Sequence, residues 1–148
     1  MQRWIAIGVV FLVLIFGAGA VGIRVYKQNR PHPVWVPLPL NPEVPGDKKL
    51  QLAKDLKKKL EDHALLVRVS HDLGLPKKLK LATDDEAANA VAARLFVKVG
   101  EADTPTGTKV PSLNVGVTGK RKDQKISEEI ALRINQDVRK ILGIGEEF

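Results

Sequence analysis

The residue types that could support catalysis or metal binding are few and poorly arranged for either chemistry. His63 and His71 lie two turns apart on a predicted helix, and no carboxylate stands at a spacing that would complete a metal site with them. The run Ser70-His71-Asp72 contains the residue types of a hydrolase triad, but consecutive residues of a helix point in different directions. The chain contains no cysteine, which excludes thiol catalysis and cysteine-ligated zinc. We therefore expect no catalytic residue, no metal site, no cofactor and no enzymatic activity.

A concentration of positive charge precedes the last predicted helix. It comprises Lys120, Arg121, Lys122 and Lys125. Gly119-Lys120 matches part of a phosphate-binding loop, but Asn114 stands where that motif needs glycine and Arg121 stands where it needs serine or threonine. Acidic residues would suit the start of a helix better, because of the helix dipole. The cluster is a candidate patch for an anionic partner, either anionic lipid or polysaccharide, and an ordinary solvated turn is the alternative.

The overall charge argues against a nucleic-acid partner. The 148 residues carry 24 Lys and Arg against 17 Asp and Glu, which gives a net charge of +7. Arg3, Arg24, Lys27 and Arg30 all precede the first acidic residue of the chain. The remaining surplus is small and spread along the sequence, whereas binding to nucleic acid needs a concentrated basic face.

Residues 4–23 form an uncharged apolar run near the amino terminus. Its length is what an α-helix needs to cross the roughly 30 Å hydrocarbon core of a bilayer, and Trp4 and Tyr26 stand where interfacial aromatic residues are expected. We predict a single transmembrane helix within an anchor of residues 1–27, with the lipid bilayer as a partner. A cleavable signal peptide ending near residues 18–20 is the alternative. The basic residues on both sides leave the orientation open.

Small residues gather at the end of this apolar run. They are Gly17, Ala18, Gly19 and Gly22. Small side chains let two membrane helices approach each other closely, so these four residues are candidates for a helix–helix contact. The alternative is that glycine and alanine are simply common in membrane helices.

The rest of the chain divides into a linker and a small domain. Residues 28–46 form a proline-rich linker that contains six of the nine prolines. Because each proline fixes φ and lacks an amide donor, we expect this segment to be extended and to include an edge strand. Residues 47–148 form the domain, in which the hydrophobic periodicity changes from helical to strand-like and back.

The domain is expected to be α+β, with helices covering a small sheet. The expected elements are helices capped by Asp47, Asp62 and Thr83, strands at 95–99 and 112–118 joined by a polar loop, and a last helix from Ile126 to Ile141. With the linker strand and the anchor, the predicted fold is a single transmembrane helix followed by the order β-α-α-α-β-β-α. The expected core comprises Leu56, Leu60, Leu66, Val69, Leu73, Val91, Leu95, Val97, Leu113, Val115, Val117, Ile130, Ile134 and Val138.

Several short sequence patterns follow the order seen in one protein family. Residues 66–75 (LVRVSHDLGL) match an L-x-x-V-x-x-x-L-x-L pattern, and residues 85–97 pass from an acidic helix start (DEA) to a strand (RLFV). Residues 112–117 (SLNVGV) and 128–135 (EEIALRIN) match the strand and the helix that follow. The chain thereby resembles the periplasmic domain of the polysaccharide chain-length determinants, the polysaccharide co-polymerases.

The resemblance implies a role in polysaccharide biosynthesis without chemistry of its own. A chain of this kind would lie in the bacterial inner membrane with its domain in the periplasm, and would form a homo-oligomer around a polymerase or export partner. The alternative is a single-pass accessory subunit that braces a larger membrane complex. Self-association of the chain would favour the first function, and recovery only with other subunits would favour the second.

Overall fold

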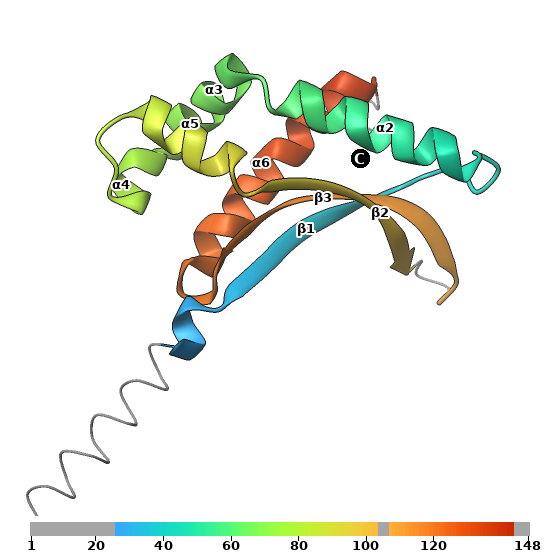
Figure 1. The fold of residues 1–148 in the computed structure, drawn as a ribbon, viewed down its shortest axis with the longest axis horizontal. Coiled ribbons are helices and arrows are strands. Elements are labelled where there is room, and N and C mark those ends of the chain that lie inside the picture. Colours follow the sequence, from blue (N-terminus) through green and yellow to red (C-terminus); the bar gives the residue numbers. More distant parts are fainter. Residues whose placement is uncertain (1–25, 104–106, 144–148) are drawn as a thin grey trace, which may run out of the picture.

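The computed structural model describes residues 26–103 and 107–143 (Figure 1). Its strands are β1 (Pro31–Pro39), β2 (Leu95–Asp103) and β3 (Lys109–Lys120). Its helices are α2 (Gly46–Leu60), α3 (His63–Leu73), α4 (Leu75–Leu79), α5 (Asp84–Ala92) and α6 (Gln124–Leu142), and a 3₁₀ turn, η1 (Arg121–Asp123), precedes α6. Four α-helices therefore lie between the first two strands of this described part of the chain.

β3 is the central strand of a three-stranded sheet in the order β1-β3-β2. Both neighbours run antiparallel to it, so that Val36 of β1 and Val97 of β2 lie on either side of Val115. Because side chains alternate between the two faces of a strand, the odd-numbered residues of β2 and β3 share one face with the even-numbered residues of β1.

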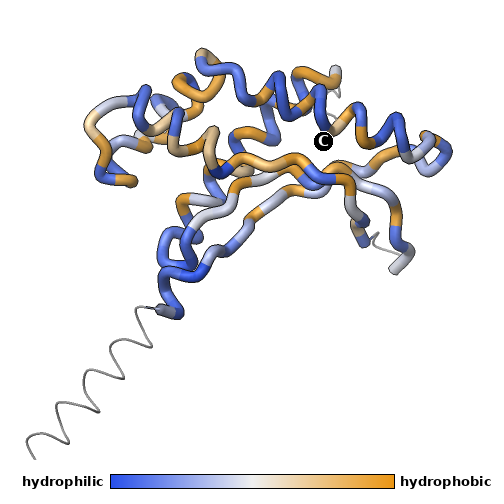
Figure 2. The backbone as a smooth tube through the Cα atoms, viewed as in Figure 1, coloured by the Kyte–Doolittle hydropathy of each residue, from blue (hydrophilic) through white to orange (hydrophobic). Residues whose placement is uncertain are grey.

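That face of the sheet carries the core, because two long helices cover it. α6 packs against β1 and β3, and α2 packs against β2 (Figure 1). In Figure 2, apolar residues along α2 and α6 alternate with hydrophilic ones, as expected for helices with one buried side. The buried apolar side chains are Leu38, Ala53, Leu56, Leu60, Leu66, Val69, Leu75, Ala87, Ala88, Val91, Leu95, Leu113, Val115, Val117, Ile130, Ala131, Ile134 and Val138. Of the expected core residues, only Leu73 and Val97 are partly rather than fully buried.

Prolines occupy the free edge of β1. The N–H of Arg121 donates to the carbonyl of Arg30 (3.1 Å) and the N–H of Leu40 donates to that of Pro111 (2.8 Å), so the even-numbered residues of this strand face β3. The odd-numbered positions, whose backbone groups face away, are Pro31, Pro33, Trp35, Pro37 and Pro39. Since proline has no N–H, this edge is a poor template for another strand.

Two of the three predicted helix caps are present. The Asp62 carboxylate accepts a hydrogen bond from the Leu65 N–H (3.3 Å) at the start of α3. At α5 the Thr83 hydroxyl accepts from the Glu86 N–H (3.2 Å). The Glu86 carboxylate accepts from the Ala82 N–H (3.0 Å), one residue before the partner expected in a capping box.

The prediction that Asp47 caps α2 is wrong. The helix begins at Gly46 with Pro45 in the cap position, and no side chain caps it. Asp47 therefore lies in the first turn, where its charge still complements the helix dipole.

The predicted fold class is wrong in its helix order. Gly74 ends α3 in a left-handed conformation (φ 60°), and a further helix, α4, begins directly after it. Pro76 lies in the first turn of α4, where its missing N–H has no intrahelical partner in any case. The fully buried Leu75 anchors this helix in the core, so the order β-α-α-α-β-β-α lacks one helix.

The predicted fold class also included a membrane-spanning helix, which the described residues do not contain. No helix within residues 26–103 and 107–143 is both long enough and apolar enough to cross a membrane. The apolar run at residues 4–23 lies outside the described residues. The candidate helix–helix contact residues Gly17, Ala18, Gly19 and Gly22 also lie outside them.

Substituting Val115 with Asp tests the position of the core. Val115 is fully buried in the central strand, so an unpaired carboxylate there should lower the free energy of unfolding by about 4 kcal/mol or more. We expect thermal unfolding followed by circular dichroism to show no cooperative transition. Thr118→Asp is the matched control, because Thr118 lies on the opposite face of the same strand and is partly exposed; equal melting of the two variants would contradict this register.

Candidate docking site on the open face of the sheet

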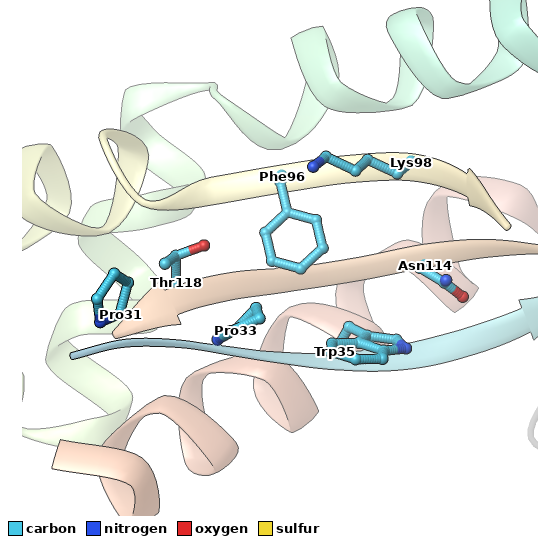
Figure 3. Close-up of a pocket in the computed structure, with 7 residues that line it drawn as sticks. All are labelled: Pro31, Pro33, Trp35, Phe96, Lys98, Asn114 and Thr118. Carbon is cyan, nitrogen blue, oxygen red and sulfur yellow. The ribbon is translucent and has the colours of Figure 1, made fainter. Parts of the chain in front are cut away.

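The face of the sheet turned away from the helices carries two aromatic side chains on either side of a glycine. Trp35 of β1 and Phe96 of β2 are both register partners of Gly116 in β3. The side chains of Trp35 and Phe96 therefore flank a position that has no side chain (Figure 3). Trp35 is 48% exposed, which is high for the largest apolar side chain of the domain.

The glycine at position 116 is required by the close approach of β1. A Cβ atom at this position would lie 2.0 Å from the Val34 carbonyl oxygen and 2.6 Å from the Cα of Trp35. Both neighbours are backbone atoms of the adjacent strand, so they could not move without separating the two strands. Gly116 thus holds β1 close to β3 and at the same time leaves a gap between the two aromatic rings.

These residues line a hollow of about 450 Å³, which we call the aromatic hollow. Its lining comprises Pro31, Pro33, Trp35, Phe96, Lys98, Asn114 and Thr118 (Figure 3). The Lys98 ammonium lies 5.6 Å from the centroid of the Phe96 ring, within the range of a cation–π contact. Asn114 accepts a hydrogen bond from the Ser112 hydroxyl (3.0 Å) and lies over Gly100, where a Cβ would approach its amide nitrogen to 2.5 Å.

The chemistry of this lining is suited to binding rather than to catalysis. The lining contains rings, one amide, one hydroxyl and one ammonium group, and no carboxylate, imidazole or thiol that could act as a base or a nucleophile. Rigid aromatic and proline rings are typical of surfaces that bind other polypeptides. In addition, no group of three or more His, Cys, Asp or Glu residues in the described part of the chain could hold a metal ion.

The side chains of residues 70–72, which contain the residue types of a hydrolase triad, do not contact one another in a triad arrangement. The Ser70 hydroxyl donates to the Asp84 carboxylate (2.7 Å), and Arg133 donates to Asp72 (2.8 Å). His71 is exposed on α3. These side chains point to different partners, so they form no triad.

An ion-pair network joins α3 to α6 through Arg133. Its guanidinium lies 2.7 Å from Asp137 on the same helix and 2.8 Å from Asp72 on α3. Hydrogen bonds to Asp137 and to Asp72 raise the pKa of Arg133 above its ordinary value, which favours the charged form of the guanidinium. The network contributes to the packing of the two helices, and sequence periodicity alone does not indicate it.

The predicted anionic-partner residues are neighbours, but they do not all face one way. Lys120 ends β3, Arg121 and Lys122 belong to η1, and Lys125 lies in the first turn of α6. Lys120 and Lys122 line a second hollow together with basic residues from earlier in the chain, and Arg121 and Lys125 do not line it. The sequence cluster is therefore only partly a structural cluster.

Trp35, Phe96 and Gly116 were not among the predicted site residues. The proline-rich sequence of residues 28–46 did predict an edge strand in this region. The missing information was the strand order, because Trp35 and Phe96 are 61 positions apart and meet only through β3.

Comparison of the chain with protein-family models, with curated proteins and with solved structures returned no match. The resemblance to the polysaccharide chain-length determinants therefore stays a prediction from the sequence.

Replacing Gly116 with Ala tests its role in this surface. The added methyl group must displace the backbone of β1, so the free energy of unfolding should fall by about 2 kcal/mol. Chemical denaturation followed by tryptophan fluorescence measures this change, since Trp35 lies beside the altered position. Gly46→Ala is the matched control, because a Cβ at Gly46 meets nothing within 4 Å; a similar loss in both variants would show that close strand approach is not the cause.

Proposed function

We propose that this protein is a non-enzymatic assembly protein of the bacterial inner membrane that associates with a second copy of itself through the aromatic hollow. The observation that carries the proposal is the exposed Trp35 beside the gap over Gly116. An exposed tryptophan next to a hollow on an uncovered sheet face is typical of a protein–protein interface.

The same face contains both a projecting ring and a space, which favours a second copy as the partner. In a two-fold symmetric pair, each face meets an identical face, so the Trp35 ring of one copy can enter the aromatic hollow of the other. Stacked sheets pack about 10 Å apart with interdigitating side chains, which leaves room for such an exchange. The lining has no carboxylate and only one cation, Lys98, so no charged partner is needed for complementarity.

The edge of β1 supports face-to-face association over edge-to-edge pairing. Four of its five outward backbone positions are proline, so a strand from another molecule would find almost no N–H donors there. The open face therefore offers the better contact on the β1 side of the sheet.

The membrane location and the role in polysaccharide biosynthesis are parts of the proposal that rest on the sequence. The apolar run at residues 4–23 supports the first. The resemblance to the chain-length determinants supports the second, together with a periplasmic domain and assembly around a polymerase or export partner. A surface that binds another protein without catalysing a reaction is consistent with the membrane location and with the role in polysaccharide biosynthesis.

The double variant Trp35→Ala, Phe96→Ala tests self-association. Native mass spectrometry of the full chain in detergent should show an oligomer for the unaltered protein and mainly monomer for the variant. Loss of one buried aromatic anchor commonly costs about 2 kcal/mol or more of binding free energy, so the dissociation constant should rise by at least about a hundredfold for the pair. Circular dichroism checks that the variant still folds, since both side chains lie on the open face.

Leu132→Ala is the matched control, because Leu132 is a large apolar side chain that is 59% exposed on α6. This variant should keep the oligomer. A monomeric unaltered protein would overturn the proposal, and recovery from native membranes only with other subunits would make the chain an accessory subunit instead. An oligomer that survives the double variant would show that another surface forms it.

A further inference from the structure

A second hollow, of about 250 Å³, lies where the end of α4, the end of α5 and the β3–η1 junction meet. Five of its nine lining residues are basic: Lys78, Lys80, Arg94, Lys120 and Lys122. Leu79, Leu81 and Ala90 form apolar walls, and Asp123 is the one acidic lining residue. We call this site the basic hollow. Its charges come from three separate stretches of the chain, so the tertiary structure creates the concentration.

Within the described residues, most of this positive charge forms no ion pair with a carboxylate. Lys78 forms an ion pair with Glu129 of α6. Within the described residues, no carboxylate lies within 4.0 Å of the charged groups of Lys80, Arg94, Lys120 or Lys122. Gathering like charges around one concave site opposes folding, and an anion bound in the hollow would relieve that repulsion.

Lys80 adds a second unfavourable feature to this site. It is the one non-glycine residue in the described chain with a positive φ (58°), a conformation that favours glycine or asparagine at the end of a helix. The backbone conformation at position 80 is higher in energy for lysine than it would be for glycine. Its side chain nevertheless lines the basic hollow, which gives a reason for lysine at this position.

The basic hollow lies at the end of the domain where β1 begins. Lys120 is the register partner of Pro31, and the Arg121 N–H donates to the carbonyl of Arg30 (3.1 Å). Figure 1 shows the start of β1 beside the loop that connects β3 to α6. The apolar run ends at Ile23, seven residues before Arg30, and seven residues span at most about 25 Å even when fully extended.

We infer that the basic hollow binds the phosphate groups of anionic phospholipids at the membrane surface. Lysine and arginine bind phosphate through charge-assisted hydrogen bonds, and basic residues near a membrane attract anionic lipid headgroups. The short distance along the chain to the apolar run brings the hollow within reach of such headgroups. Lys27 and Arg30 directly precede β1 in the sequence and add positive charge near this end of the domain. This inference rests on the membrane location proposed above, but it does not depend on self-association, because it concerns a different surface and a different ligand.

The test measures lipid binding by the full chain. The protein is reconstituted in nanodiscs of phosphatidylcholine, and dihexanoyl phosphatidylglycerol, dihexanoyl phosphatidylcholine or inorganic phosphate is titrated while amide shifts are followed by NMR. We expect saturable binding of the phosphatidylglycerol, with shifts at residues that line the basic hollow. Binding should weaken in high salt, because the attraction is screened.

The variant Lys80→Gln, Lys120→Gln, Lys122→Gln should weaken phosphatidylglycerol binding at least tenfold, since each basic residue near an anionic surface contributes a factor of about five. The matched control is Lys54→Gln, Lys58→Gln, Lys59→Gln, which removes the same charge from exposed positions of α2. The control should change binding less than twofold. Equal effects of the two triple variants, or an unchanged affinity of the first, would overturn the inference.

The variant Lys80→Gly distinguishes an effect on lipid binding from an effect on the stability of the fold. Glycine removes the charge and also suits the positive φ at this position, so the melting temperature should stay the same or rise while lipid binding weakens. Unchanged lipid binding in this variant would overturn the assignment of Lys80. Binding of inorganic phosphate as tightly as of phosphatidylglycerol would show a site for a free anion and overturn the lipid assignment. None of these readouts reports the oligomeric state, so they leave the proposed self-association independently testable.

Discussion

The close pairing of the central strand β3 with both of its neighbours is the constraint on which the described structure depends. Leu113, Val115 and Val117 point from β3 into the core and are almost completely buried, beneath the two long helices. On the other side of the same strand, Gly116 allows the backbone of β1 to come so close that no side chain would fit. The core is thus built on one face of β3, and no helix among the described residues covers the other face.

The uncovered face and the proline-rich edge together determine how this sheet can meet another molecule. An exposed sheet can associate with other molecules in an uncontrolled way through two features, an apolar face and an open edge. Here the edge of β1 is largely closed by prolines at the positions whose backbone groups face outward. The aromatic rings of Trp35 and Phe96 remain accessible on the face, so association is directed to the face rather than to that edge.

β3 also connects the two surfaces for which functions are proposed. Thr118 lines the aromatic hollow, whereas Lys120, two positions further along, lines the basic hollow. If the basic hollow contacts lipid headgroups, the aromatic hollow of the same molecule is held at a set distance from the membrane surface. A second copy bound to the same membrane would then present its aromatic hollow at the same height, which favours pairing of like faces.

Local sequence patterns determined much of the fold, and the tertiary structure decided the sites. The caps at Asp62 and Thr83, the stop at Gly74 and the apolar positions of the strands could be predicted because each depends on residues within about one or two turns or on simple alternation. The short helix α4 was missed, since five residues are too few to show a period and its position is set by the burial of Leu75. The aromatic hollow and the basic hollow could not be predicted, because each joins residues that are distant in sequence, Trp35 with Phe96 and Lys80 with Lys120. Composition supplied the rings and the charges, but only the strand order and the helix packing brought them together.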